Sequence, residues 1–144
     1  MRVDFVVPGE PQGKGRPRFS SRVGRTFART PEATVVYENL IRVEYERQCY
    51  GHRYDDSDML SLQVIAHYGI PSSASKRKKQ DMVTGKIRPT KKPDADNVLK
   101  VVADSLNQIA YRDDAQIVNV QVAKFYSHTP RLSISIKNIL EEKP

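Results

Sequence analysis

The sequence has few cysteines and histidines, the residues that form disulfides and bind zinc in many small proteins. It has one cysteine, Cys49, so no disulfide can form within the chain. It has no cluster of cysteine and histidine, which argues against a zinc site. No apolar run approaches membrane-spanning length, and the first residues, MRVDFVVPGE, lack the pattern of a signal peptide. We therefore expect a cytoplasmic protein with no membrane association.

Acidic residues are scarce where basic residues are dense. The net charge is +7, and residues 76–92 contain a single acid, Asp81, while residues 14–29 contain none. Such clustering favours a polyanionic partner, above all nucleic acid, although a basic run can also be a solvated surface. The candidate DNA-binding residues are the basic side chains of these two segments: Lys14, Arg16, Arg18, Lys76, Arg77, Lys78, Lys79, Lys86 and Arg88.

Alternation of apolar and polar side chains predicts four strands, over residues 2–7, 59–68, 116–126 and 131–138. The short SHTP segment between the last two predicts that they form an antiparallel hairpin. The segment 9–29 is rich in Gly, Pro, Ser and Arg, which is typical of a loop or a loose hairpin. The side chains expected on one side of their strands are Leu60, Leu62, Val64 and Ala66, then Val118, Val120 and Val122, then Leu132, Ile134 and Ile136.

Two longer helices are predicted between these strands. The first begins at Thr30-Pro31-Glu32, with a hydroxyl cap and proline at the first helical position, and runs to about Cys49. The second runs from about Asp96 to Asn107, and a short helix lies around 75–82. The expected apolar faces are Val36, Leu40 and Val43 in the first, and Val98, Leu99, Val102 and Leu106 in the second. The order βαβαββ predicts an α+β fold, a single domain over residues 1–144 with helices packed on a mixed sheet.

Aspartates are concentrated at the two ends of the second long helix. Asp94 and Asp96 lie at its start, and Asp113 and Asp114 follow its end. One aspartate at a helix start is ordinarily a cap, but capping needs a single carboxylate. Packing on one sheet can return Asp114 beside Asp94 and Asp96, and three carboxylates form an oxygen site that suits Mg²⁺ or Mn²⁺.

Lys100 and Asp104 share a helix stripe with Asp96, at the spacing i, i+4, i+8. Phosphodiester hydrolysis needs an activated water and a shield for the charge that develops on the phosphate. Metal ions held by carboxylates can supply both, and the Lys100 ammonium can contact a phosphate oxygen in the transition state. The alternative for Lys100 is a salt bridge to Asp96, and Asp104 is expected to be solvated or to support Lys100.

The acidic motifs resemble the signature of a known nuclease family. KPDADNVLKVVADSLN followed by AYRDDAQIVNVQVAKFY resembles the central signature of the RusA-type Holliday junction resolvases, endodeoxyribonucleases of bacteria and their prophages. GEPQGKGRPRF is similar to the N-terminal motif of many members. The lysine-rich segment at about 71–92 is a basic insertion relative to shorter members.

The resemblance implies a function and a set of site residues. It makes Asp94, Asp96 and Asp114 the essential acids that hold Mg²⁺, for which Mn²⁺ can substitute, and Lys100 the catalytic lysine. Asp113 fits the first aspartate of the pair, which has a secondary role at the metal. Asn97 and Gln116 fit as supporting neighbours. The implied protein is a homodimer that resolves four-way DNA junctions by paired symmetrical nicks.

Two other functions remain open at this point. One is a related metal-dependent nuclease that cuts flaps or other branched DNA, and the other is a non-catalytic basic DNA-binding module with capping aspartates. Catalysis by Ser/His/Asp or Cys/His is not favoured, because none of the three histidines has an evident nucleophile partner. We expect Tyr37, Tyr45, Phe125 and Tyr126 to be core or strand residues.

Overall fold

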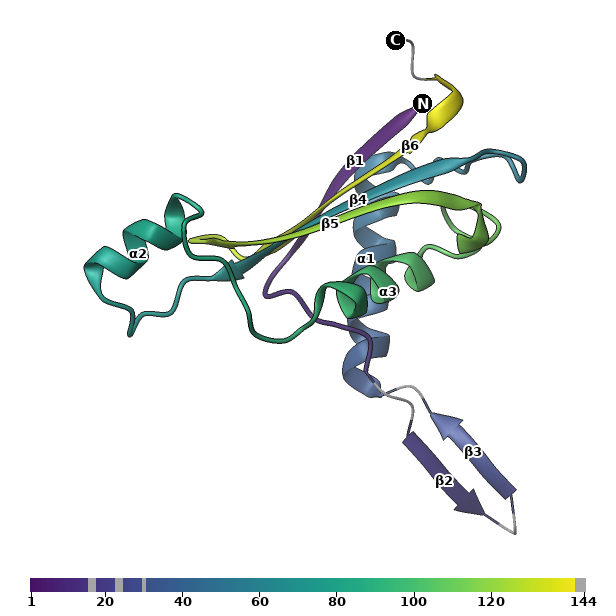
Figure 1. Cartoon of the computed structure of the whole chain (residues 1–144). Coiled ribbons are helices and arrows are strands. Elements are labelled where there is room, and N and C mark those ends of the chain that lie inside the picture. The colour runs from purple at the N-terminus through teal and green to yellow at the C-terminus, as the bar shows by residue number, and fades with distance from the viewer. Residues whose placement is uncertain (16–17, 23–24, 30, 142–144) are drawn as a thin grey trace.

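The computed structural model describes residues 1–15, 18–22, 25–29 and 31–141, and the side chains of residues 1–15 and 31–140. Within these ranges the predicted order of strands and helices is confirmed (Figure 1). One sheet contains β1 (Arg2–Pro8), β4 (Leu60–Gly69), β5 (Ile117–Ser127) and β6 (Arg131–Asn138). The α-helices are α1 (Glu32–Cys49), α2 (Lys76–Val83) and α3 (Ala95–Ser105). The short 3₁₀ helices are η1 (Asp114–Gln116) and η2 (Ile139–Glu141).

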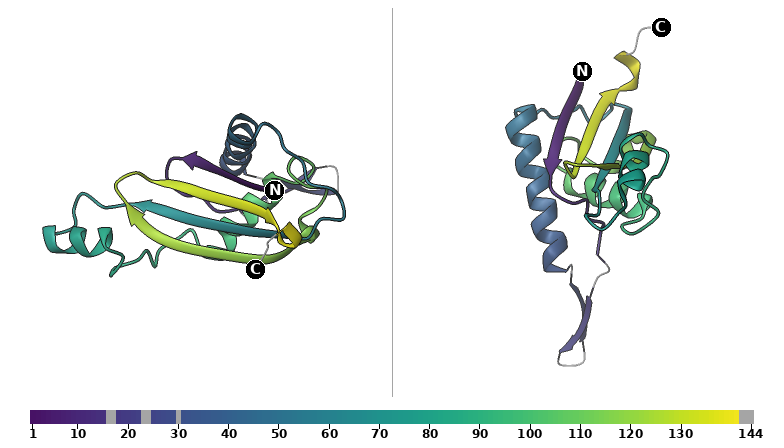
Figure 2. Two further views of the ribbon diagram at one scale, coloured as in Figure 1. Left: turned by 90° about the horizontal axis from the view of Figure 1, so that it is seen from above. Right: turned by 90° about the vertical axis from the view of Figure 1, so that its left-hand side faces the viewer.

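The strands lie side by side in the order β1-β6-β4-β5 (Figure 2). Strand β6 pairs antiparallel with both β1 and β4, whereas β4 pairs parallel with β5. The predicted antiparallel hairpin of β5 and β6 is therefore wrong, because β4 lies between them. Alternation fixes which side chains of a strand share a face, but it does not identify the neighbouring strand.

The core lies on one face of this sheet. Leu60, Leu62, Val64 and Ala66 of β4 are fully buried there, as predicted. The predicted inward residues of β6 are also buried, in one core cluster with Val98, Val101 and Val102 of α3. Strand β5 departs from the expectation, because Val118 and Val120 are exposed. It is an edge strand, so its side chains have a neighbouring strand on one side only.

Helix α1 buries a different face from the predicted one. Val36 and Val43 are 62% and 59% exposed, and Leu40 is only partly buried. The buried face carries aromatic and polar side chains beside one isoleucine: Thr34, Tyr37, Glu38, Ile41, Glu44, Tyr45 and Cys49. The exposed face carries valines, so counting the aliphatic residues on each face of the helix identifies the wrong face as buried. Burial of Tyr37 and Tyr45 confirms their predicted core role.

The start of α1 also differs from the prediction. Pro31 occupies the N-cap position and Glu32 is the first helical residue, so proline does not stand at the first helical position. Thr30, the predicted hydroxyl cap, lies outside the described residues.

A hairpin and a helix lie at the periphery of the molecule (Figure 1). The segment before α1 contains β2 (Arg18–Arg22) and β3 (Arg25–Arg29), which pair antiparallel as a separate hairpin. Helix α2 occupies the lysine-rich segment, as predicted, and Ser75 caps it by accepting a hydrogen bond from the Lys78 N–H. None of the helices in the described ranges is long and apolar enough to cross a membrane.

Candidate active site

The start of α3 holds the first two predicted acids. Asp94 stands at the N-cap position and Asp96 lies in the first turn. The side chain of Asp94 makes no capping hydrogen bond, although its main-chain carbonyl accepts one from Val98. Simple capping therefore does not account for either carboxylate, and both side chains are exposed.

Tyr68 fixes the chain just before α3. Its hydroxyl donates to the Pro93 carbonyl at 2.5 Å, which links β4 to the residue preceding Asp94. Burial raises the pKa of Tyr68 to about 12, and the nearby negative charge of Asp94 is a smaller cause of the same shift.

An open hollow of about 350 Å³ lies between α3 and the start of β5. The predicted helix stripe lines it, since Asp96, Lys100 and Asp104 all face this space, and Asp114 joins them. Its apolar lining is Leu99, Ala103, Ile117 and Val120. Asp94 lines a neighbouring hollow with Lys92 instead. The structure thus brings Asp96, Lys100 and Asp114 to one hollow and places Asp94 beside it.

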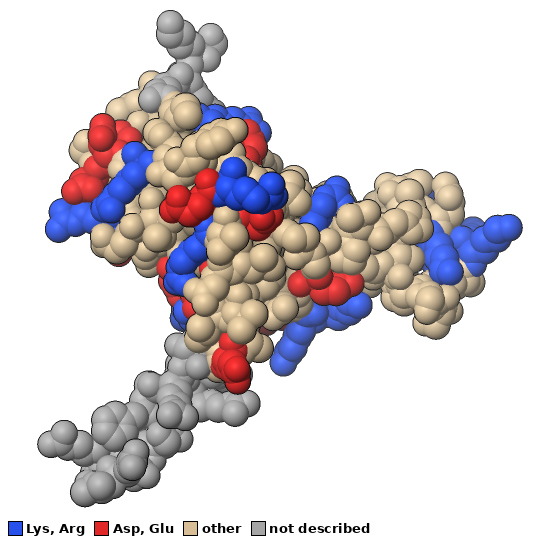
Figure 3. Space-filling model, turned by 180° about the vertical axis from the view of Figure 1, so that it is seen from behind, with Lys and Arg blue, Asp and Glu red and all other residues tan. Residues whose placement is uncertain are grey.

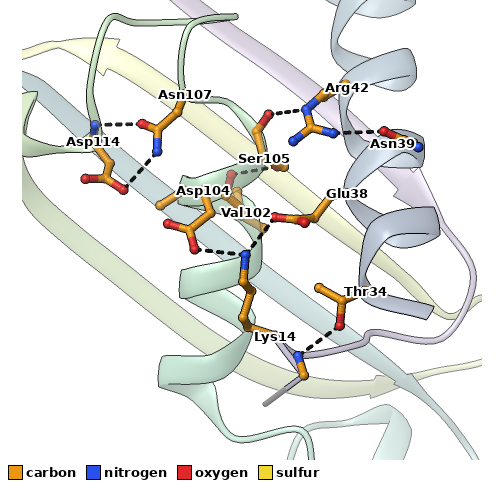
Figure 4. A network of polar contacts seen from close by, with 12 residues as sticks. Lys14, Thr34, Glu38, Asn39, Arg42, Val102, Asp104, Ser105, Asn107 and Asp114 are labelled. Carbon is orange, nitrogen blue, oxygen red and sulfur yellow. Dashed lines mark hydrogen bonds and ion pairs between the residues drawn. The ribbon is translucent and has the colours of Figure 1, made fainter. Parts of the chain in front are cut away.

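Asn107 holds Asp114 in place at two points (Figure 4). The Asn107 side-chain oxygen accepts from the Asp114 main-chain N–H at 2.8 Å. Its amide nitrogen donates to the Asp114 carboxylate at 3.3 Å. The sequence patterns did not identify Asn107 as a site residue. The available signal was an asparagine directly after a helix, where its side chain commonly bonds nearby main-chain groups.

Asp113 and Gln116 form a reciprocal capping box around η1. The Asp113 carboxylate accepts from the Ala115 N–H at 3.0 Å, and the Gln116 side-chain oxygen accepts from the Asp113 N–H at 3.3 Å. The Gln116 amide also donates to the carbonyls of Asp55 and Asp58 in the loop before β4. Because the Asp113 carboxylate is used in capping, this box orients the turn that presents Asp114.

Tyr111 supports the same turn from within the core. Its buried hydroxyl donates to the Ala103 carbonyl at 2.6 Å, which ties the turn after α3 back to that helix. Burial, together with the charge of Asp114, raises its pKa well above the usual range for tyrosine.

Lys14 reaches α3 from the connector that follows β1. Its ammonium lies 3.1 Å from a Glu38 oxygen and 3.2 Å from an Asp104 oxygen (Figure 4). Burial opposes the Lys14 charge, but the hydrogen bonds to Glu38 and Asp104 outweigh it and raise the pKa of Lys14. Glu38, which sequence reasoning missed, is a buried carboxylate on α1 with only 9% of its side chain exposed.

The connector around Lys14 packs closely against both helices. A Cβ on Gly13 would lie 3.0 Å from the side chains of Asn97 and Pro93, and one on Gly15 would lie 2.7 Å from the Thr34 hydroxyl. The Lys14 N–H donates to the Asn97 carbonyl, and the Gly15 N–H donates to Thr34. Asn97, a predicted supporting residue, therefore contacts the Gly-Lys-Gly segment.

The predicted DNA-binding residues fall into distinct settings. Lys76, Arg77 and Lys78 are exposed on α2, whereas Lys79 is partly buried, and Figure 3 shows basic side chains at this end of the molecule. Lys86 is also exposed. Arg88 donates to the Lys124 carbonyl and stacks over Phe125, 4.1 Å from the ring centroid. Arg16 and the Arg18 side chain lie outside the described part of the chain.

The donor atoms of the hollow suit a divalent metal. Carboxylate oxygens are the ligands that Mg²⁺ prefers, and Asp96 and Asp114 supply them on one hollow beside a lysine. In the ranges that the structure describes, no three His, Cys, Asp or Glu side chains are gathered as a ready metal cage. The fit to Mg²⁺ therefore rests on the kind of donor atom, which is carboxylate oxygen, and not on a complete set of ligands.

Comparison with known proteins identifies the family of the chain. The family model described as Endodeoxyribonuclease RusA matches residues 8–137, which include the Gly-Lys-Gly connector, α3 and Asp114. A protein of Bacillus subtilis (strain 168), named Uncharacterized protein YqaN, is 36% identical over 141 residues, covering 95% of this chain and 96% of the relative. This chain belongs to the RusA endodeoxyribonuclease family.

Proposed function

We propose that this protein is a Mg²⁺-dependent endodeoxyribonuclease that resolves four-way DNA junctions by paired nicks. The observation that carries the proposal is the hollow where Asp96, Lys100 and Asp114 meet, within a chain that matches the RusA family. The combination of carboxylates and an ammonium serves hydrolysis of a phosphodiester better than it serves DNA binding alone, since carboxylates repel phosphate unless a cation intervenes.

Asp94, Asp96 and Asp114 would hold the Mg²⁺, for which Mn²⁺ is an alternative ion. When bound, the ion supplies positive charge for the phosphate and an acidified water. Lys100 contributes an exposed ammonium on the same hollow, where it can contact a phosphate oxygen as charge develops. Asn107 and the capping box of Asp113 and Gln116 fix the position of Asp114, and Asn97 supports the start of α3.

DNA binding is assigned to the basic surface outside the hollow. Helix α2 lies at one end of the molecule, apart from α3 (Figure 1), so its basic side chains can contact phosphates without being neutralised by the acids of the site. The arginines of segment 16–29, including Arg16 and Arg18, stay a prediction for the same role. Such a substrate implies that the protein works in the cytoplasm.

A homodimer would match the substrate. A four-way junction has approximate twofold symmetry and needs nicks in two opposed strands, and C2 dimers are the commonest protein assembly. Two sites on one dimer also keep the second phosphate at a high effective concentration after the first cut. We therefore propose one acidic site for each subunit of a C2 dimer.

The test is to incubate the purified protein with a synthetic mobile four-way junction, with Mg²⁺ and with a chelator, and to map nicks on every strand. Flap and linear duplexes of the same sequence serve as controls. We expect symmetrical nicks in opposed strands that require Mg²⁺. Preferential cutting of flaps would identify a different branch nuclease, and binding without nicks would identify a non-catalytic module. Sedimentation equilibrium at assay concentration checks the dimer.

A further inference from the structure

We infer that Lys14 is a positioning residue that holds Asp104 away from Lys100, so that the Lys100 ammonium stays available to the DNA phosphate. The inference rests on the proposed function for Lys100. It assigns Lys14 a role inside the protein, in place of the phosphate contact that its position in a basic segment predicts.

The competition is set by helix spacing. Lys100 and Asp104 are four residues apart on α3, a spacing at which opposite charges ordinarily pair. Both side chains line the same hollow. In the described part of the chain, however, Lys100 forms no ion pair, and Asp104 pairs with Lys14 at 3.2 Å. Asp96, at the same spacing on the other side of Lys100, also forms no ion pair with it, and the pairing of Asp104 with Lys14 keeps this second acid from Lys100.

The surroundings of Lys14 keep it in this position. Its side chain is only 20% exposed and contacts a second carboxylate, Glu38, on α1. On either side of it, Gly13 and Gly15 lie so close to the two helices that a side chain at either position would collide with them. To reach DNA, Lys14 would have to leave two carboxylates, one of them buried, which is costly.

As a consequence, the charged residues of the hollow have different partners. Asp104 is neutralised by Lys14, whereas Asp96 and Asp114 remain for a cation and Lys100 remains for phosphate. Without Lys14, Asp104 would carry an unpaired charge one helical turn from Lys100. The two would then pair, and the ammonium would be withdrawn from the reacting phosphate.

The test compares two variants that differ only in the charge of Asp104. Lys14→Met alone would leave the buried Glu38 carboxylate without a positive partner, and that variant can fail to fold. Both variants therefore also carry Glu38→Gln. We expect K14M/E38Q to nick a saturating junction about tenfold more slowly than wild type, because a misplaced reacting group has effects of this size or larger. K14M/E38Q/D104N should recover most of that loss. Melting curves verify that both variants are folded.

A second readout does not depend on activity. Lysines are labelled by reductive ¹³C-methylation, and the Lys100 resonance is assigned by its loss in Lys100→Arg. That resonance should move in K14M/E38Q and return towards its wild-type position in K14M/E38Q/D104N. It can be measured whether or not wild type cuts junctions, so failure of the proposed nuclease function remains distinguishable.

Three results would overturn the inference. One is normal nicking by K14M/E38Q at saturating junction. Another is equal impairment of the two variants, which would show that Asp104 is not the cause. The last is a Lys100 resonance that does not respond to the charge of Asp104. Weaker junction binding by K14M/E38Q with normal saturated nicking would return Lys14 to a phosphate-binding role.

Discussion

The side chain of Asn107 contacts Asp114 through both its oxygen and its nitrogen, one on the main chain and one on the carboxylate. A side chain bonded in this way fixes the direction of the neighbouring carboxylate as well as its position. Asn107 follows α3 while Asp114 begins η1, so this pair determines where the last acid of the hollow lies relative to Asp96.

The first prediction tests the two hydrogen bonds between Asn107 and Asp114. Asn107→Ala should lower junction nicking by about tenfold to a hundredfold, since small displacements of reacting groups have such effects. It should lower the free energy of unfolding by only about 1–2 kcal/mol, as expected when a hydrogen bond is removed. Single-turnover nicking and urea unfolding measure the two. Asn119→Ala, which removes an asparagine bonded to Ser61 in another hollow, is the matched control and should nick normally. Equal nicking by both variants would contradict the assignment.

The second prediction separates the neighbouring aspartates. Asp113→Asn should keep nicking, because an asparagine oxygen can still accept the capping hydrogen bond from Ala115. Asp113→Ala should lose about 1 kcal/mol of stability with the cap. Asp114→Asn should abolish nicking with little change in stability. A severe loss of nicking in a folded Asp113→Asn protein would instead indicate that Asp113 is a metal ligand.

The third prediction concerns the other acid of the hollow. Asp96→Asn should abolish cleavage and leave junction binding intact or tighter, because removal of a negative charge favours phosphate while the proposed metal loses a ligand. Nicking assays at increasing Mg²⁺ and gel-shift titrations measure the two effects. Wild-type nicking by the variant at saturating Mg²⁺ would remove Asp96 from the site.

The fourth prediction addresses the basic surface of α2. K78Q/K79Q should weaken junction binding and reduce the salt dependence of affinity, by about 0.9 in the log–log slope for each duplex phosphate that the variant no longer neutralises. The control R2Q/R53Q removes the same charge elsewhere, where Arg2 is exposed and already paired with the exposed Asp4. Binding is measured over a range of salt concentrations. If the two variants show the same slope, α2 is not part of the DNA-binding surface.

The fifth prediction follows from the buried tyrosines. Burial raises the pKa of five of them, to about 12 for Tyr37, Tyr54 and Tyr68, and higher for Tyr45 and Tyr111. Unfolded tyrosines ionise near pH 10, so between about pH 10 and 12 the unfolded chain releases protons that the folded chain retains. This stability is fully present below about pH 10 and is lost as pH rises through that window.

Urea unfolding at increasing pH, with tyrosinate absorbance as the signal, measures this effect. The midpoint should fall steeply above about pH 10, and the absorbance of the five tyrosines should appear only with unfolding. Their gradual ionisation in the folded protein with an unchanged midpoint would contradict the prediction.

Much of the fold followed from periodicity, and its failures have physical causes. Leu132, Ile134 and Ile136 alternate strictly and are buried, so β6 was predictable. In α1 the buried face depends on Tyr37 and Tyr45. Because each carries a hydroxyl, neither is counted when the buried face is identified from aliphatic side chains alone. The partner of β5 was not predictable, because pairing with β4 depends on the whole sheet rather than on the sequence of either strand.

The site was predictable where spacing along one helix determines it. The stripe of Asp96, Lys100 and Asp104 lines one hollow as the i, i+4, i+8 pattern indicates. Contacts between distant segments were not accessible in the same way. Glu38 is tolerated inside the protein because Lys14 covers it, and nothing in the sequence near either residue reveals that pairing.

Asp96 and Asp114 lie on the crossover that connects β4 to its parallel neighbour β5, and Ile117 and Val120 of β5 complete the lining of their hollow. Parallel pairing closes a long loop and forms slowly during folding. Strand β5 is also an edge strand with no fully buried residue, so it is the part of the sheet that can detach while β1, β6 and β4 remain paired. On warming, we therefore expect the hollow to lose its geometry when this outer strand detaches, before the core itself unfolds.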